Sequence, residues 1–253
     1  MTYSEVLQAA RGCSGPYCKA CPVCNGRACG SSMPGPGAKG TGTVAVRNYE
    51  AWQSIRLDLD TICENKPVDT RYTFFGQQYD LPVFAGPVGA TKLHYGEKYD
   101  DQAYNSILVP ACAQAGIAAF TGDGTNPDVM TMATKAIGNA DGCGVPTIKP
   151  WKNERIIHHI RLAEEAGAKA VCCDVDSAGL INLKLLGKPV DPKSAKDLEE
   201  IISCTKLPFI VKGLVTPRAA KIAAELGAYG IVISTHGGRI IPDAPATASV
   251  IGE

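Results

Sequence analysis

The sequence lacks a net charge, a long apolar run and a leader-like start, and each absence excludes a class of protein. Its 253 residues carry 25 Lys and Arg against 25 Asp and Glu. There is therefore no broad positive field for nucleic-acid phosphates and no polybasic membrane anchor. No stretch approaches the roughly 18 apolar residues of a membrane span. The first residues show no basic segment followed by an apolar one, so we expect a cytoplasmic protein.

Cysteine is abundant but unevenly placed. Of eleven cysteines, most of those beyond residue 29 lie in apolar runs, where cysteine behaves as a small core hydrophobe. The first five form the pattern C-x₄-C-x₂-C-x₂-C-x₄-C, and they are Cys13, Cys18, Cys21, Cys24 and Cys29. A disulfide framework does not suit a reducing compartment.

Three thiolates at x₂ spacing, with a fourth close by, suit an iron–sulfur cluster or zinc. Because four ligands suffice, the sequence predicts a metal site formed by Cys18, Cys21, Cys24 and Cys29, and Cys13 is not needed. The alternative is a loop that is only cysteine-rich or redox-active. The spacing does not decide between the two.

The chain divides into two segments by composition. Residues 1–47 form a Cys-, Gly- and Pro-rich segment, in which 12–43 read as loop. Residues 48–253 carry the predicted barrel. At its start, apolar residues near helical spacing predict a short helix over 48–59: Tyr49, Trp52, Ile55 and Leu59.

From residue 81 onward, short apolar runs alternate with amphipathic stretches. The predicted strands are Leu81–Ala85, Ile117–Phe120, Pro146–Ile148, Ala168–Cys173, Pro208–Val211 and Gly230–Ile233. The predicted helices are Asp101–Ala115, Asn126–Ile137, Asn153–Ala166, Lys193–Ser203 and Pro217–Leu226. A helix end, a glycine and a buried strand recur in AQAGIAAF, EEAGAKAV and AAELGAYGIV. This repeat predicts βα units and a parallel sheet.

Six consecutive βα units favour an α/β fold of the (β/α)₈ TIM-barrel class over a doubly wound sheet. No strand is followed by a G-x-G-x-x-G helix start, which disfavours a Rossmann-type domain. A closed barrel needs about two more units. We therefore expect an incomplete barrel. Either another chain completes the barrel, or the sheet stays open, or the polypeptide is a fragment. Its two apolar edges predict poor solubility or a homo-oligomer.

In a parallel barrel, chemistry is placed at the carboxyl ends of the strands. Three predicted strand ends carry polar side chains near glycines: Asp174 and Asp176 at the first, Lys212 at the second, and His236 and Arg239 at the third. A lysine directly after three apolar residues needs a partner. For Asp174 an ordinary loop or capping role remains open. Together these residues predict a ligand site.

The strand ends also carry a family resemblance. The segments are LPVFAGPVGA (81–90), EEAGAKAVCCDVD (164–176), FIVKG (209–213) and GIVISTHGGR (230–239). They resemble the FMN-dependent α-hydroxy acid oxidase and dehydrogenase family, over roughly residues 45–245. The resemblance implies a TIM barrel that binds FMN at its carboxyl-end face and acts on a small-molecule substrate.

By this resemblance, His236 is the base that takes a substrate proton and Arg239 binds the substrate carboxylate. Asp176 orients His236 and stabilises its protonated form. Lys212 lies near the flavin N1/C2 carbonyl. The set is physically coherent, since it pairs a base with a carboxylate and supplies cations for substrate and cofactor. The remaining implied flavin contacts are Ala85, Gly86, Pro87, Thr121 and Thr147.

The sequence also departs from the family. Thr235 replaces the Asn before the histidine, and Lys149 stands where the family has a substrate-contacting Tyr. FTGDGT replaces a Trp-containing segment at 120–125, and the amino-terminal Tyr has no counterpart. The chain stops before the glycine-rich segments that hold the flavin phosphate, so we expect most of that subsite to be missing.

The favoured function is an FMN-dependent oxidoreductase that acts on a small 2-hydroxy acid. Two alternatives remain open at this point. One is an FMN-dependent isomerase of the type 2 isopentenyl diphosphate isomerase kind. The other is an inactive or metal-binding remnant.

Overall fold

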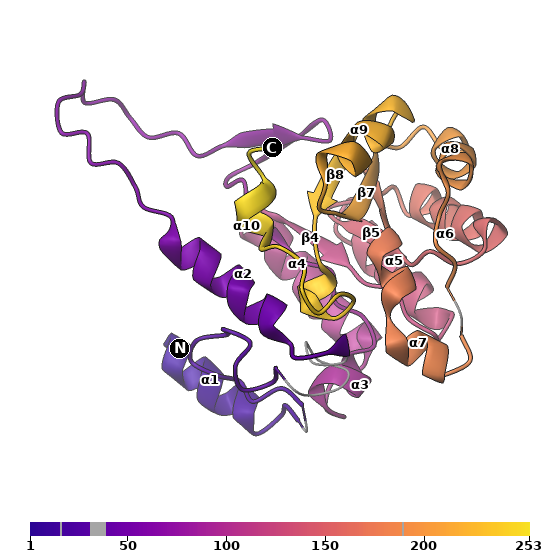
Figure 1. Cartoon of the computed structure of the whole chain (residues 1–253), viewed down its shortest axis with the longest axis horizontal. Coiled ribbons are helices and arrows are strands. Elements are labelled where there is room, and N and C mark those ends of the chain that lie inside the picture. The colour runs from indigo at the N-terminus through magenta and orange to yellow at the C-terminus, as the bar shows by residue number, and fades with distance from the viewer. Residues whose placement is uncertain (16, 31–38, 189) are drawn as a thin grey trace.

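The computed structural model describes residues 1–15, 17–30, 39–188 and 190–253. Its main feature is a six-stranded parallel sheet in the order β3-β4-β5-β6-β7-β8, so that each strand pairs with the next one along the chain (Figure 1). The strands are β3 (Phe84–Ala85), β4 (Ala118–Thr121), β5 (Val145–Ile148), β6 (Val171–Asp174), β7 (Phe209–Leu214) and β8 (Gly230–Ile233). This sequential order is that of a barrel wall and not of a doubly wound sheet.

Helices alternate with the strands in the predicted order. They are α4 (Asp101–Gln114), α5 (Asp128–Gly138), α6 (Asn153–Glu165), α8 (Ala195–Ser203) and α9 (Pro217–Glu225). Local signals set the ends of two of them. The Thr216 side chain accepts a hydrogen bond from the amide of Ala219, with Pro217 in the first turn, and Ser194 forms a capping box with Asp197. The predicted βα repeat is confirmed.

The burial of the strands explains why apolar runs in the sequence predicted them. Every residue of β4, β5 and β6 is buried, as parallel strands covered on both faces require. On the outer face, Cys173 and Val211 pack with Ile156 of α6 and Ile201 of α8. On the inner face, Cys172 packs in a separate cluster with the residues Phe75, Phe120, Val145, Ala170 and Ile210.

An antiparallel hairpin that the sequence analysis did not predict lies beside the inner face. It consists of β1 (Tyr72–Phe74) and β2 (Gln77–Tyr79). The rings of Phe74 and Phe75 contact Tyr229, the residue just before β8. The hairpin therefore lies toward the amino ends of the strands and leaves the carboxyl ends accessible.

The amino-terminal part contains more helix than expected. Helix α1 (Tyr3–Arg11) begins with a capping box between Thr2 and Glu5, and it was missed because none of its residues is buried. Helix α2 is Thr43–Ser54, so the predicted helix over 48–59 is misplaced and a helix crosses the predicted segment boundary at 47. Leu57 and Leu59 are 96% and 90% exposed, so their spacing reflects no buried face.

The first strand is shorter than predicted. Leu81 and Val83 are exposed, and pairing with β4 is confined to Phe84 and Ala85. Within the described residues, β3 and β8 each pair on one side only, so the barrel is incomplete. None of the helices described here has the length and apolar character that crossing a membrane requires.

Candidate active site

Four buried titratable side chains meet at the carboxyl ends of three neighbouring strands. Asp174 ends β6, and Asp176 lies in the short 3₁₀ helix η2 (Val175–Gly179) that follows. Lys212 lies in β7, and His236 begins the 3₁₀ helix η3 (His236–Gly238) after β8. Because the strands are parallel and adjacent, their carboxyl ends place these groups together. The predicted convergence of Asp176, Lys212 and His236 is confirmed.

The distances define a connected network. His236 Nδ1 lies 2.8 Å from Asp176 Oδ1 and 3.4 Å from Asp174 Oδ2. Lys212 Nζ donates to Asp174 Oδ1 at 2.6 Å and to both Asp176 oxygens at 3.3 Å. Each buried charge therefore has an opposite charge within hydrogen-bond reach, which is the condition for burying it at all. Asp174 is an ion-pair partner and not an ordinary loop residue.

The network shifts the pKa values of its members in different directions. Burial tends to raise the pKa of Asp174, but His236 and Lys212 outweigh it and hold that pKa well below its usual value. Burial raises the pKa of Asp176. Burial also acts to lower the pKa of Lys212, yet the carboxylates of Asp174 and Asp176 keep it raised. Lys212 thus carries a fixed positive charge between two carboxyl groups.

Among the described residues, Asp174, Asp176 and His236 are also the one group of three metal-type ligands whose ligand atoms all lie within 4.8 Å. The Lys212 ammonium already contacts both carboxylates of that group. A metal ion would have to share this space with a cation. The donor set therefore fits an ion-paired base and not a metal centre.

Glycine makes room for the network at one position. The backbone shifts register between Lys212 and Leu214, and Gly213 between them has φ +108°. A Cβ at Gly213 would overlap the Asp176 side chain. This irregularity changes the direction of the chain at the end of β7. It also lets Asp176 approach the strand closely.

The segment after β8 has an unusual backbone. His236, Gly237 and Gly238 have φ values of 53°, 64° and 79°, three consecutive left-handed residues. Such strain in a non-glycine residue is found where the surroundings hold it for function. The turn leads the chain to Arg239, whose Nε donates to the His236 carbonyl at 3.1 Å. The predicted pair His236 and Arg239 is therefore linked directly.

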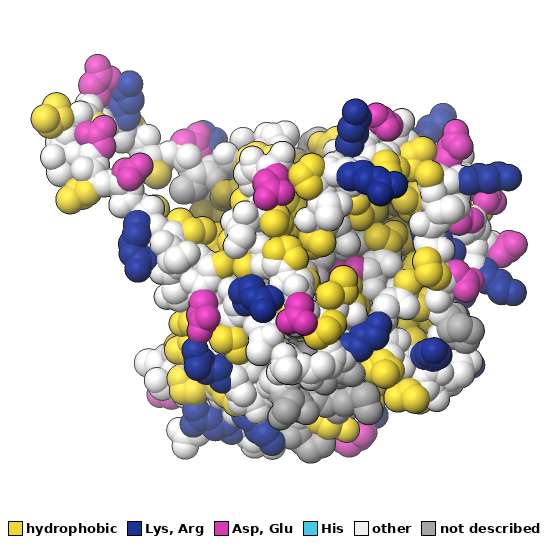
Figure 2. All heavy atoms as spheres, in the orientation of Figure 1, with side chains coloured by type: hydrophobic (Ala, Val, Ile, Leu, Met, Phe, Trp, Pro, Cys, Tyr) yellow, Lys and Arg dark blue, Asp and Glu magenta, His cyan; other side chains and the backbone are white. Residues whose placement is uncertain are grey.

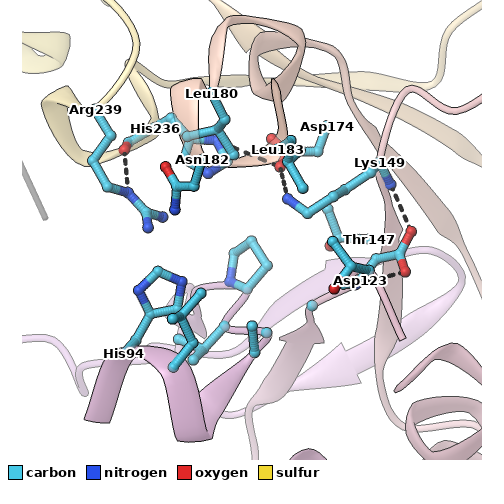
Figure 3. A pocket seen from close by; sticks show the side chains of 18 of the residues that line it. His94, Asp123, Thr147, Lys149, Asp174, Leu180, Asn182, Leu183, His236 and Arg239 are labelled. Carbon is cyan, nitrogen blue, oxygen red and sulfur yellow. Dashed lines mark hydrogen bonds and ion pairs between the residues drawn. The ribbon is translucent and has the colours of Figure 1, made fainter. Parts of the chain in front are cut away.

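A pocket of about 100 Å³ opens beside the network (Figure 3). Its charged and titratable lining residues are His94, Tyr95, Asp123, Lys149, Asp174, His236 and Arg239. His94 comes from α3 (Thr91–Tyr95) and faces Arg239 across the pocket in Figure 3. Burial, and then the neighbouring cations, lower the pKa of His94 to about 4. Burial also lowers the pKa values of Lys149 and Arg239. The pocket therefore suits a small anion.

Asp123 supports one wall of this pocket, and sequence reasoning missed it. Its carboxylate accepts hydrogen bonds from the Lys149 amide at 3.0 Å, from Trp151 Nε1 at 2.6 Å and from the Gly124 amide at 2.7 Å. It is buried two residues after the end of β4. An acid between two glycines at a strand end was the available signal. Asp123 fixes the backbone that carries Lys149, whose Nζ lies 3.9 Å from Asp174 Oδ2.

Asn182 is a second pocket residue that the sequence did not reveal. It lies in α7 (Ile181–Leu185), which covers one side of the pocket with Leu183. Its side-chain oxygen is buried and has no hydrogen-bond partner in the described part of the chain. A buried acceptor facing a polar pocket is suited to a ligand donor such as a hydroxyl.

Four of the six predicted flavin contacts lie around a second, larger space. A cavity of about 570 Å³ is lined by Ala85, Gly86, Pro87 and Lys212, and Pro87 also lines the small pocket. Thr147 lines the small pocket. The buried Thr121 hydroxyl has no partner among the residues that the structure describes, as a cofactor contact requires. The lining of the larger cavity is mostly apolar, with Lys212 as its charged group, and this suits the flat face of a ring such as that of FMN.

The cysteines lie at a third place. Cys18, Cys21, Cys24 and Cys29 all line a cavity of about 420 Å³, whereas Cys13 does not line it. No three of the four sulfur atoms lie within 4.8 Å of one another. The expected metal at this position stays a prediction.

Comparison with known proteins identifies relatives of this chain. The family model of the FMN-dependent dehydrogenases matches residues 36–185 and 182–253. Glycolate oxidase 1 of Oryza sativa subsp. indica is 26% identical over 249 residues, with 81% of this chain and 63% of that protein covered. A 2-hydroxyacid oxidase of Dictyostelium discoideum is 43% identical over 244 residues, with 81% and 60% covered. The chain thus spans somewhat less than two thirds of the length of these curated relatives.

Solved structures support the fold. A crystal structure of mandelate oxidase is 21% identical and superposes with a TM-score of 0.73, with 99% of this chain and 74% of the other covered. This likeness confirms the expected TIM-barrel architecture, of which six strands are described here. Because the family model covers most of the chain, the chain belongs to the FMN-dependent dehydrogenase family.

Proposed function

We propose that this chain carries the substrate-oxidising centre of an FMN-dependent enzyme that converts a small 2-hydroxy acid to the 2-oxo acid. The observation that carries the proposal is the buried His236–Asp176 contact of 2.8 Å beside a small cationic pocket. Relatives named glycolate oxidase and 2-hydroxyacid oxidase support the same substrate class.

His236 supplies the base. Its Nδ1 faces the Asp176 carboxylate, so the other ring nitrogen, Nε2, is the one left to accept a proton from substrate. The positive charge that His236 gains is then stabilised by Asp176 and Asp174. Lys212 offsets one of the two carboxylate charges in the resting site.

Arg239 and Lys149 would bind the acid. Both line the pocket, and a guanidinium matches the planar geometry of a carboxylate. Asn182 is placed to accept a hydrogen bond from a substrate hydroxyl. FMN, when bound against residues 85–87, would supply the two-electron acceptor. The chain's own groups bind, orient and deprotonate the substrate.

The test is reduction of bound flavin under anaerobic conditions, with excess FMN and a panel of 2-hydroxy acids. We expect bleaching of the flavin absorbance by at least one acid. His236→Ala should slow bleaching about 10²–10⁴-fold without loss of bound flavin. His158→Ala, at an exposed position of α6, is the matched control. Bleaching by no 2-hydroxy acid, with turnover of an isoprenoid diphosphate instead, would favour the isomerase alternative.

Binding of a metal by Cys18, Cys21, Cys24 and Cys29 is a separate part of the proposal. Its support is the C-x₂-C-x₂-C spacing and the shared cavity. Both zinc and an iron–sulfur cluster are compatible with thiolate ligands of this number.

A further inference from the structure

The fold brings four of the five amino-terminal cysteines to one place. Those four line one cavity of about 420 Å³. Cys13 is engaged elsewhere, with its sulfur 3.1 Å from Lys98 Nζ and 3.2 Å from the Ala9 carbonyl oxygen. Four cysteines around one space, with the fifth directed away, is the arrangement of a ligand set and not of a loop that is merely rich in cysteine.

The spacing of the sulfur atoms discriminates between the two candidate metals. Four thiolates on one zinc lie about 3.8 Å apart, since each Zn–S bond is about 2.3 Å and the geometry is tetrahedral. No three ligand atoms of this set lie within 4.8 Å of one another. In a [4Fe–4S] cluster each cysteine binds a different iron atom, and bridging sulfides occupy the space between the irons. Sulfur atoms that are not gathered around a single ion, and that line a cavity of about 420 Å³, fit the cluster better than one zinc ion.

The loop that carries the cysteines is held in place. Ala20 and Gly26 have positive φ values of 44° and 78°, which fold the chain tightly between successive cysteines. The Ala20 amide donates to Cys18 Sγ at 3.5 Å, a contact that stabilises a metal-bound thiolate. A Cβ at Gly26 would overlap Ala45 of α2, so the loop packs closely on that helix.

The cavity also adjoins the proposed active site. His94, Tyr95 and Arg239 line both the cysteine cavity and the substrate pocket. We propose that Cys18, Cys21, Cys24 and Cys29 bind an iron–sulfur cluster, separated from the substrate pocket by a wall formed by His94, Tyr95 and Arg239. This site is a second redox centre that relies on no feature of the flavin site for its ligands.

The first experiment measures iron and acid-labile sulfide in the 253-residue chain purified without oxygen. We expect iron and sulfide in equal amounts and an electron paramagnetic resonance signal after reduction with dithionite. Cys21→Ser and Cys24→Ser should lose both, whereas Cys13→Ser should keep them. Circular dichroism of each variant separates loss of the cluster from loss of the fold. Zinc without sulfide in the wild-type chain, or metal-free protein, would overturn the proposal.

The second experiment tests the position of the cluster. Arg239→Gln removes a positive charge from the cavity wall, so the cluster's reduction potential should fall. Arg218→Gln, at an exposed position on α9, is the matched control and should leave the potential unchanged. Equal potentials in both variants would contradict the shared wall. Neither experiment uses a substrate, so failure of the cluster and failure of the proposed oxidation remain distinguishable.

Discussion

His236 Nδ1 lies 2.8 Å from Asp176 Oδ1 although sixty residues separate the two in sequence. The contact depends on two adjacent parallel strands, β6 and β7, and on β8 beside them. It fixes the orientation of the imidazole ring before any substrate enters.

Asp176→Asn should preserve the shape of the site while removing the carboxylate that orients and charges His236. We expect flavin reduction by a 2-hydroxy acid to slow at least about 10²-fold, with little change in the substrate concentration that gives half-maximal rate. Rapid-mixing absorbance measurements would show this. Asp243→Asn, at an exposed position, should behave like the wild type. An unaltered rate in Asp176→Asn would exclude Asp176 as the positioning residue.

Gly213→Ala should destabilise the fold as well as the site. The new methyl group would overlap Asp176, and alanine is strained at φ +108°. We expect a loss of about 1–3 kcal/mol in the free energy of unfolding, measured in urea. Gly227→Ala is the control, because its φ is +86° but open space surrounds the position. Equal losses in the two variants would mean that backbone strain alone, and not contact with Asp176, determines the effect.

Much of this site follows from the sequence because strand ends are local features. An apolar run followed by a polar residue marks a carboxyl end, and parallel order brings such ends together. This logic found Asp176, Lys212 and His236. It could not assign Asp174, since an acid after a strand serves equally well as a cap. Only the 2.6 Å contact with Lys212 settles its role.

Other features depend on tertiary contacts that no local pattern contains. Asn182 becomes a pocket residue through the placement of α7 over the pocket. The hairpin around Gly76 was missed because its strands are three residues each and only Phe75 and Tyr79 are well buried. Helix α2 was misplaced because its anchor is the buried Val44, while the apolar residues that suggested a later start face solvent.

Stability should depend on pH through His94. Its pKa is about 4 in the folded chain, below its ordinary value of 6.5, because burial and the cations Arg239 and Lys149 oppose its charging. The unfolded chain therefore binds a proton at a higher pH than the folded chain does. Stability should fall as pH decreases from about 6.5 toward 4. Urea unfolding at pH 5 and pH 7 should show a smaller difference for His94→Gln than for the wild type. Identical pH dependence would argue against a neutral, buried His94.

Lys149→Met should weaken substrate binding more than it slows the chemical step. Lys149 lines the pocket, and its removal leaves Arg239 as the main cation for the acid. Losing a charged hydrogen bond costs about 1.5–3 kcal/mol, so the substrate concentration for half-maximal rate should rise tenfold or more. Lys152→Met, which is exposed, is the control. If only the maximal rate changed, Lys149 would act on the reacting atoms and not on binding.

The edges of the sheet should govern how the 253-residue chain behaves in solution. Within the described residues β3 and β8 are each unpaired on one side, and Tyr229 and Ile231 are partly exposed there. Hydrophobic side chains gather on the face where β8 and α10 (Thr247–Val250) lie (Figure 2). Apolar strand edges promote association.

We therefore expect oligomers in size-exclusion chromatography and weak retention of added FMN, because β3 and β8 both border the proposed flavin cavity. Ile231→Lys should reduce association, since a charged side chain at a strand edge opposes pairing with another edge. Lys206→Ile, which places an apolar residue away from that edge, should not reduce it. A monodisperse monomer that holds one FMN per chain would show that the edges are covered in solution and that the flavin cavity is complete without a partner.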